Sequence, residues 1–124
     1  MLTVALVLAA LAAALHVFIW YLESFAWTGR ARAVFGTTAE EALATRELAF
    51  NQGFYNLFLA VVTAVGIGLH AAGATDAGTA LVVAGAGSML AAALVLGLTS
   101  PGKRGAAVRQ GTLPLLALLA LALA

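Results

Sequence analysis

The sequence contains no cysteine and few charged residues. Of its 124 residues, 9% are charged, with six Lys or Arg against five Asp or Glu. The lack of cysteine excludes disulfides, thiolate metal ligands and a cysteine nucleophile. A net charge of +1, without a basic run that carries interleaved aromatics, argues against nucleic acid as a partner. There is no HExxH motif and no glycine-rich phosphate loop, so hydrolase and nucleotide-driven functions are disfavoured.

Apolar residues, by contrast, are abundant. They make up 64% of the chain and give a mean hydropathy of +1.07, whereas soluble domains are roughly 45–50% apolar and about 25% charged. Four stretches are long enough to cross a bilayer as helices. The sequence predicts one all-α domain over residues 1–124, an antiparallel four-helix transmembrane bundle in contact with membrane lipid. Its spans cover about residues 2–27, 46–72, 77–99 and 108–124.

The basic residues indicate an orientation for this bundle. All six flank the first and third connections, whereas the second connection carries Asp76 and has His70 nearby. By the positive-inside rule, the first and third connections are cytoplasmic. We therefore expect an integral protein of the bacterial cytoplasmic membrane with both termini outside.

Small residues are concentrated in the third span. Residues 84–88 read Ala-Gly-Ala-Gly-Ser, and Ala91, Ala92 and Ala93 follow. Small residues four apart let two helix backbones approach closely in a membrane. We expect this surface to pack against another helix, either in the same chain or in a second copy, and we favour a homo-oligomer.

Polar side chains within the spans are the candidates for function, because hydrocarbon penalises them. In the first span, offsets of four, seven and eleven residues from His16 reach Trp20, Glu23 and Trp27, and these offsets share one helix face. Trp20 beside Glu23 could offer its ring face to an organic cation. The first interpretation of both Trp20 and Trp27, however, is that they are anchors at the membrane boundary.

The second span carries a polar series of its own. Glu47, Asn51 and Tyr55 recur every four residues. At 1.5 Å per residue, Glu23 and Asn51 each lie roughly 6–8 Å inside the cytoplasmic boundary, so the two series should meet. We expect one polar pocket that opens toward the cytoplasm. Its predicted ligand-binding residues are Glu23, His16, Trp20, Asn51, Gln52, Tyr55, Asn56 and Gln110.

Several of these residues have structural interpretations that the sequence leaves open. For Asn51, Gln52 and Asn56, hydrogen bonding between helices is the favoured alternative to ligand contact. Glu23 could pair with Arg109 or Arg46, or it could titrate a proton or bind a cation. His16 could be an interhelical hydrogen bonder. A helical separation of about 10 Å prevents His16 and Glu23 from ligating one metal ion, so no metal is expected.

The resemblance to a known family rests on three groups of residues: His16, Glu23 and Trp27; the run Asn51-Gln52-Gly53-Phe54-Tyr55-Asn56; and Gln110, Gly111 and Pro114. The chain resembles a family of small bacterial and fungal integral-membrane proteins classed as a domain of unknown function. The resemblance covers nearly the whole chain. It implies a four-helix membrane fold and no established activity, so no catalytic residue follows from it.

Three functions remain open. The favoured one is binding, with transport, of a small lipophilic or cationic molecule, because one strong acid among several amides suits recognition. A membrane-embedded acid–base enzyme of isomerase or transferase type would need a second group, which His16 could supply. The third is a structural assembly partner without a ligand. No cofactor is expected for any of them.

Overall fold

The structure, a computed structural model, describes all residues from 1 to 124, and every element in it is helical. Four helices are long and apolar enough to cross a membrane. The chain is therefore a four-helix transmembrane bundle, as the sequence predicts. Its elements are α1 (Leu2–Phe25), α2 (Ala31–Phe35), α3 (Ala39–Ala71), α4 (Thr75–Thr99), the 3₁₀ turn η1 (Pro101–Lys103) and α5 (Arg104–Ala122).

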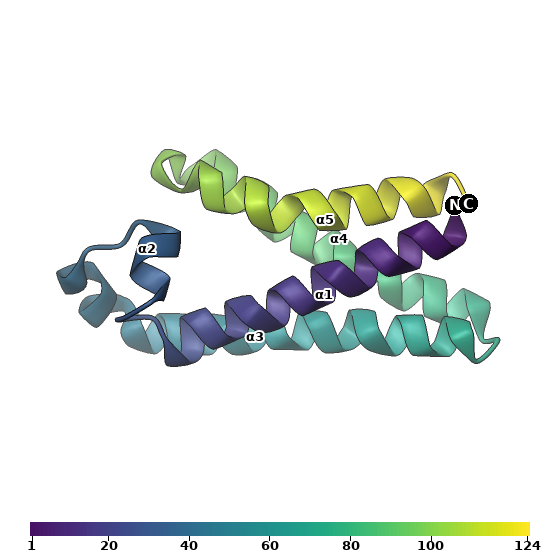
Figure 1. Cartoon of the computed structure of the whole chain (residues 1–124), viewed down its shortest axis with the longest axis horizontal. Coiled ribbons are helices and arrows are strands. Elements are labelled where there is room, and N and C mark those ends of the chain that lie inside the picture. The colour runs from purple at the N-terminus through teal and green to yellow at the C-terminus, as the bar shows by residue number, and fades with distance from the viewer.

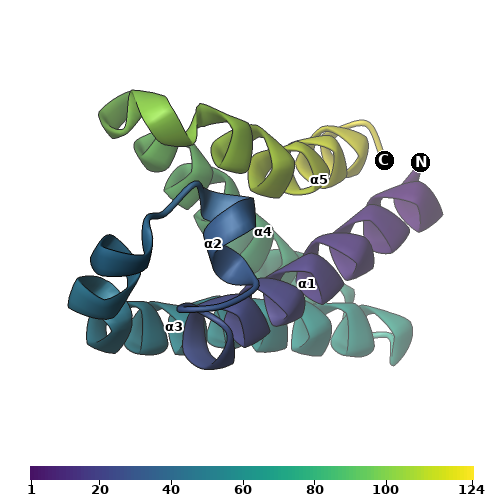
Figure 2. The ribbon, with the colours of Figure 1, turned by 60° about the vertical axis from the view of Figure 1, so that its left-hand side comes forward.

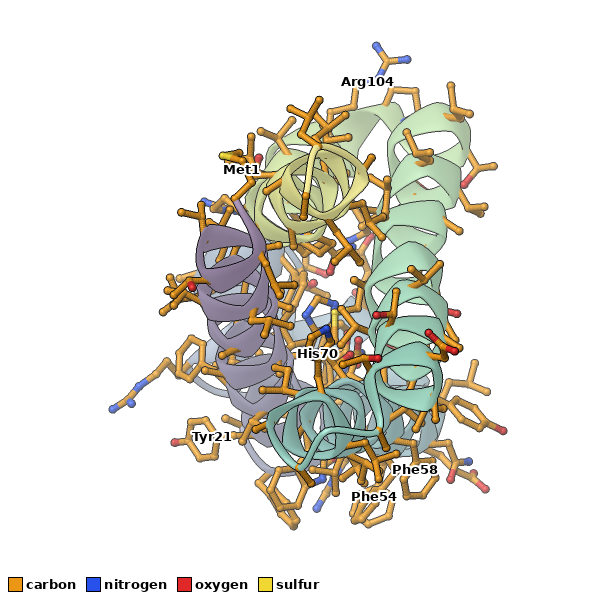
Figure 3. All side chains as sticks on the ribbon, turned by 90° about the vertical axis from the view of Figure 1, so that its right-hand side faces the viewer. Met1, Tyr21, Phe54, Phe58, His70 and Arg104 are labelled. Carbon is orange, nitrogen blue, oxygen red and sulfur yellow. The ribbon has the colours of Figure 1, made fainter.

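The long helices form a ring in the order α1, α3, α4, α5, and each contacts its two neighbours (Figure 3). Successive long helices run antiparallel. One end of the bundle holds both termini and the turn of residues 72–74, and we call it the turn end (Figure 1). The opposite end holds α2 and η1, and we call it the α2 end.

The helix pairs change from one end to the other. At the turn end α1 lies beside α5, whereas at the α2 end it lies beside α3 (Figure 1). α4 crosses in the same way, from α3 at the turn end to α5 at the α2 end. The α1–α3 pair and the α4–α5 pair are therefore spread apart at the α2 end, and α2 lies between them (Figure 2).

Two helices begin earlier than their predicted spans. α3 begins at Ala39 rather than near residue 46, and α5 begins at Arg104 rather than near residue 108. At 33 residues, α3 is about 50 Å long, whereas the hydrocarbon core is about 30 Å thick. Its first turns therefore extend beyond the hydrocarbon.

The start of α3 is fixed by a capping box. The Thr38 hydroxyl accepts from the Glu41 N–H at 3.2 Å, and the Glu41 carboxylate accepts from the Thr38 N–H at 3.0 Å. Thr38 followed three residues later by Glu41 is the usual sequence signature of such a cap. The sequence does not predict α2, a helix of five residues that ends at Gly36 in the left-handed conformation.

Small residues bring the helices together at the turn end. A Cβ at Gly66 would lie 2.7 Å from the Val82 nitrogen, and one at Gly78 would lie 2.6 Å from the His70 nitrogen. Gly85 packs directly against Thr63 in the same way. The predicted small-residue surface of α4 therefore has α3 of the same chain as its partner along this face.

The outward surface of the bundle is apolar. Large apolar side chains are exposed along all four long helices, and Tyr21, Phe54 and Phe58 point away from the ring (Figure 3). The buried apolar residues are mostly alanines. Small residues inside and large apolar residues outside are consistent with lipid around the bundle.

Candidate functional site

A cavity of about 670 Å³ lies between the long helices in the half of the bundle next to α2. Polar side chains from three of them meet its inner part: His16 and Glu23 from α1, Gln52 and Asn56 from α3, and Gln110 from α5. The remaining lining residues are Trp27, Phe35, Thr37, Glu41, Thr45, Leu48, Ala49, Tyr55, Leu59, Ala92, Leu96, Ser100 and Lys103.

Glu23 is bound by an amide and not by an arginine. Its Oε2 accepts a hydrogen bond of 2.9 Å from Asn56 Nδ2. Arg109, one of the partners that the sequence left open, donates instead to the Val34 carbonyl at 2.9 Å. Arg46, the other, borders a separate depression on the outer side of α3. The carboxylate that lines the cavity therefore has no basic side chain as its partner.

Gly53 positions this pair of side chains. It is buried, and a Cβ there would lie 3.1 Å from both the Ser24 nitrogen and the Trp20 carbonyl oxygen, in addition to overlapping the Ser24 hydroxyl. The hydroxyl of Ser24 donates to the Phe50 carbonyl at 2.9 Å. α1 and α3 are thus in backbone contact beside Glu23, which brings its carboxylate within reach of α3.

His16 is buried deeper in the bundle than Glu23. Its Nδ1 lies 2.9 Å from the Ala12 carbonyl oxygen, so Nδ1 carries the proton and donates to the helix backbone. In the neutral ring, Nε2 is then the acceptor. His16 lines the cavity, so this nitrogen is the one available there.

Gln110 reaches the cavity from α5. The next residue, Gly111, is buried, and a Cβ there would lie 2.8 Å from the Ala93 Cβ of α4. Pro114 has no N–H, so the Gln110 carbonyl receives no helical hydrogen bond from position 114. The Gln-Gly-x-x-Pro segment therefore brings α5 close to α4 at Gly111 and leaves the Gln110 carbonyl oxygen able to accept a hydrogen bond beside the cavity.

The end of the cavity is crossed by α2 and its neighbours. Trp27 donates through Nε1 to the Thr45 hydroxyl at 3.0 Å, and its ring packs on Phe35 at 5.5 Å between centroids. Lys103 Nζ donates to the Phe35 carbonyl at 3.2 Å. Together with the bond from Arg109 to Val34, this ties α2 to η1 and α5.

The opening of the cavity lies along α3 and α4. The exposed lining residues are Glu41, Leu48, Gln52, Tyr55 and Ala92, all on these two helices, whereas the lining residues from α1 and α5 are buried or half-buried. The sequence predicts an opening at the end of the bundle. The structure differs because α2, a helix that the sequence does not predict, crosses that end.

Two predicted site residues, Asn51 and Trp20, lie outside the cavity. Asn51 is exposed and borders the outer depression together with Glu47. Trp20 packs on Phe25 and Phe54 with centroids 5.5 and 5.7 Å apart, and its buried indole N–H has no hydrogen-bond partner. The structure brings together the other six predicted residues, His16, Glu23, Gln52, Tyr55, Asn56 and Gln110.

The face of α3 was predicted wrongly, and helix geometry gives the reason. A series spaced by four, such as Glu47, Asn51 and Tyr55, drifts by about 40° at each step. Offsets of four, seven and eleven stay on one narrow face, and starting from Thr45 they reach Ala49, Gln52 and Asn56, which all line the cavity. The offsets that the sequence uses for α1 identify the cavity face of α3 as well. Tyr55 of α3 also lines the cavity, but these offsets do not reach it. Lys103, Phe35 and Thr37 line the cavity from outside α3, so a pattern within one helix cannot identify them.

The model of the family described as "Protein of unknown function (DUF1304)" matches residues 10–122, more than nine-tenths of the chain. The chain belongs to the DUF1304 family. No curated protein and no solved structure matches it. The match confirms the resemblance to a family of unknown function, and residues 10–122 include every residue that lines the cavity.

Proposed function

We propose that the protein binds a small lipophilic or cationic molecule in the cavity and transports it. The observation that supports this most directly is a carboxylate, Glu23, that lines a cavity of about 670 Å³ with an amide as its only side-chain hydrogen-bond partner. Small-molecule pockets typically measure about 300–1,000 Å³. A carboxylate held in a membrane bundle requires a partner or a proton, and a bound cation supplies the partner.

The surrounding side chains suit recognition. Asn56 already holds one oxygen of Glu23, which orients the carboxylate. Gln52 and Gln110 each offer both a donor and an acceptor, and Nε2 of His16 offers an acceptor. Glu23, with these neutral polar groups around it, can therefore fix the polar end of a ligand, while the apolar lining accepts the remainder; the other charged lining residues, Glu41 and Lys103, lie toward the α2 end.

The test is mass spectrometry of compounds that co-purify with the protein. We expect a compound with the wild-type protein and at least tenfold less of it with Glu23→Gln, which keeps the size of the side chain and removes the charge. Glu47→Gln is the matched control, because Glu47 lies on the same bundle end, is exposed and does not line the cavity. Equal recovery from all three proteins, or no compound from any of them, would overturn the proposal.

The second candidate is an acid–base enzyme. It is favoured by one observation, namely that His16 and Glu23 line the same cavity, with about 10 Å between their positions along α1. A substrate would have to span that distance. Recovery of a chemically altered compound, with loss of the change in both Glu23→Gln and His16→Gln, would replace the transport proposal with this one.

A structural role in an assembly of copies is the third candidate. Position 87 on α4 faces open space, and the neighbouring Ala84, Ser88 and Ala91 are exposed, so a second helix could approach there. We propose a homo-oligomer as an addition to binding. Cross-linking at Ala91→Cys in the otherwise cysteine-free chain tests it, and a monomer at every protein-to-lipid ratio would reject it.

We further propose that the α2 end faces the cytoplasm and both termini lie outside. The support is the charge distribution, since all Lys and Arg residues lie in or beside the connections at the α2 end. Single cysteines at Thr28 and Ala74, probed in whole cells with a membrane-impermeant maleimide, should label at Ala74 alone. Labelling at Thr28 alone would reverse the orientation.

A further inference from the structure

The cavity changes in chemical character from its floor to its opening. The floor, on α1 and α5, carries Glu23, His16 and Gln110. Between α3 and α4 the lining includes the apolar residues Leu48, which is 67% exposed, Leu59, Ala92 and Leu96, and the exposed polar residues Glu41, Gln52 and Tyr55 lie on α3 beside them. A ligand that lies across the cavity would place a polar group at α1 and an apolar group against Leu48, Ala92 and Leu96.

The gap between α3 and α4 follows from where these helices touch. Gly66 and Gly85 bring them into backbone contact near the turn end. Farther toward the α2 end, Leu59 of α3 and Ala92 of α4 both line the cavity instead. The helices therefore diverge beyond the glycine contacts, and the divergence produces an opening on the side of the bundle.

The depth of this opening places it against lipid. Counting back about 20 residues from Ala71, the length that crosses the hydrocarbon, reaches position 52 of α3. The exposed α3 residues at the opening extend from Glu41 to Tyr55, so they run from the head-group region into one leaflet. Glu23 is two residues from the end of α1, at the level where lipid head groups meet the hydrocarbon.

The end of the bundle, in contrast, is packed. The hydroxyl of Thr37 beside the cavity is shut off from solvent and has no hydrogen-bond partner. Trp27 lies under Phe35, and Lys103 ties the C-terminus of α2 to η1. These contacts close the part of the end that α2 crosses, and the exposed Glu41 in the first turn of α3 marks where the opening reaches the head-group region.

We infer that the ligand is an amphipathic amine that enters sideways from the bilayer between α3 and α4. Its ammonium group pairs with Glu23 and its apolar chain leaves through the opening into the lipid. The inference rests on the proposed function, and it adds a ligand class and a route. An ammonium on one apolar chain matches the charge of Glu23 on the floor, the apolar lining between α3 and α4, and the opening toward lipid on that side.

The experiment uses two diazirine-bearing probes on the full chain in lipid nanodiscs. One is a diazirine dodecylamine, which partitions into the bilayer, and the other is a diazirine ethylamine, which stays in water. After illumination, mass spectrometry maps the labelled residues. We expect the dodecylamine probe to label the cavity lining at least tenfold more than the ethylamine probe, with competition by unlabelled dodecylamine and at least tenfold loss in Glu23→Gln.

The route is tested by narrowing the opening with a bulky side chain. Ala92→Trp should reduce labelling of the cavity by the dodecylamine probe at least fivefold. Ala91→Trp is the matched control, because Ala91 is an exposed neighbour on the same helix that does not line the cavity, and it should leave labelling unchanged. From the side of α3, Leu48→Trp should act like Ala92→Trp, with the equally exposed Leu43→Trp as its control.

The outcomes separate the route from the proposed function. Two results would overturn lateral entry and leave binding intact. One is cavity labelling that depends on Glu23 but is unaffected by both Ala92→Trp and Leu48→Trp. The other is equal cavity labelling by the two probes. Absence of cavity labelling by both probes would overturn the amine as the ligand class. A co-purifying compound lost in Glu23→Gln would still support the proposed function in that case. If Ala92→Trp does not fold, the Leu48→Trp result alone decides the route.

Discussion

The same two helices, α3 and α4, are in backbone contact at one end of the bundle and frame a cavity at the other. At the turn end, glycines at positions 66, 78 and 85 bring backbone and side-chain atoms of the facing helix to distances that leave no room for a Cβ. At the α2 end, the facing residues include Leu59 and Leu96, and they line the cavity. The size of the side chains at the contact therefore sets where the helices touch and where they spread.

This difference explains where polar groups are tolerated. Thr63 at the contact is fully buried, and its hydroxyl donates a hydrogen bond of 2.9 Å to the Leu59 carbonyl of its own helix. Glu23, Asn56 and Gln110 are only half-buried and meet at the cavity. In a bilayer, polar side chains need a partner or a water-accessible space, and only the spread end provides that space.

The largest effect is expected at the tight end. Gly78→Ala would place a Cβ 2.6 Å from the His70 nitrogen and 2.7 Å from the Gly66 carbonyl oxygen. Because these are backbone atoms, the helices must separate, and we expect a loss of about 3 kcal/mol in the free energy of unfolding. Gly87→Ala is the control, since nothing lies within 4 Å of that position, and it should gain up to about 1 kcal/mol from helix propensity. Unfolding by denaturant in micelles, followed by circular dichroism, measures both, and equal stability of the two variants would contradict the contact.

A smaller loss is expected at the glycine contact beside the cavity. The atom nearest to a Cβ at Gly53 is the Ser24 hydroxyl, which can rotate away, and backbone atoms follow at 3.1 Å. We expect Gly53→Ala to cost about 1.5 kcal/mol. Removing the hydroxyl as well, in Gly53→Ala with Ser24→Ala, should recover part of that loss. The same micelle unfolding tests this, and a double variant less stable than the sum of the two single changes would argue against the contact.

The interaction between Glu23 and Asn56 should appear as a coupling energy. A double-mutant cycle with Glu23→Ala and Asn56→Ala is expected to give about 0.6 kcal/mol, and at most about 1.7 kcal/mol, the range for hydrogen bonds between membrane helices. The cycle of Glu23→Ala with Asn51→Ala is the control, because Asn51 lies outside the cavity, and it should give no coupling. If the Asn51 cycle showed the larger energy, α3 would be rotated relative to the face described above.

The most local effect concerns the bonds that hold α2. Lys103→Met with Arg109→Met removes both donors to the α2 carbonyls. Each bond stabilises by about 1 kcal/mol, so hydrogen exchange of the α2 amides should accelerate by about fivefold or more while the long helices stay protected. Arg104→Met is the control, because Arg104 donates to Gly97 instead. Unchanged exchange in the double variant would show that α2 is held by the packing of Phe35 alone.

The long helices could be predicted from the sequence because their signals are local. Hydropathy over some 20 residues identifies a span, and Thr38 with Glu41 forms the cap that the sequence indicates. The five residues of α2 give no such signal. They are too few to show a hydrophobic period, and their position depends on Lys103 and Arg109, about 70 residues away along the chain.

The candidate site was predictable in part. Residue offsets place His16 and Glu23 on the same face of α1, and the structure keeps both in the cavity lining. The face of α3 was not found, because the polar residues of that helix occupy several faces and periodicity alone does not choose among them. The choice is made by Gly53, which turns that side of α3 toward α1. Binding by these residues remains a prediction.

The sequence by itself determined that this protein is a bundle of four transmembrane helices with polar groups in one half of it. Composition and hydropathy act on each helix separately, so they need no knowledge of the neighbours. The tertiary structure alone decided that Glu23 is held by Asn56, that α2 crosses the end, and that the cavity opens between α3 and α4. These features depend on how closely two backbones approach and how each helix is rotated, and steric contacts between residues far apart in the sequence set both.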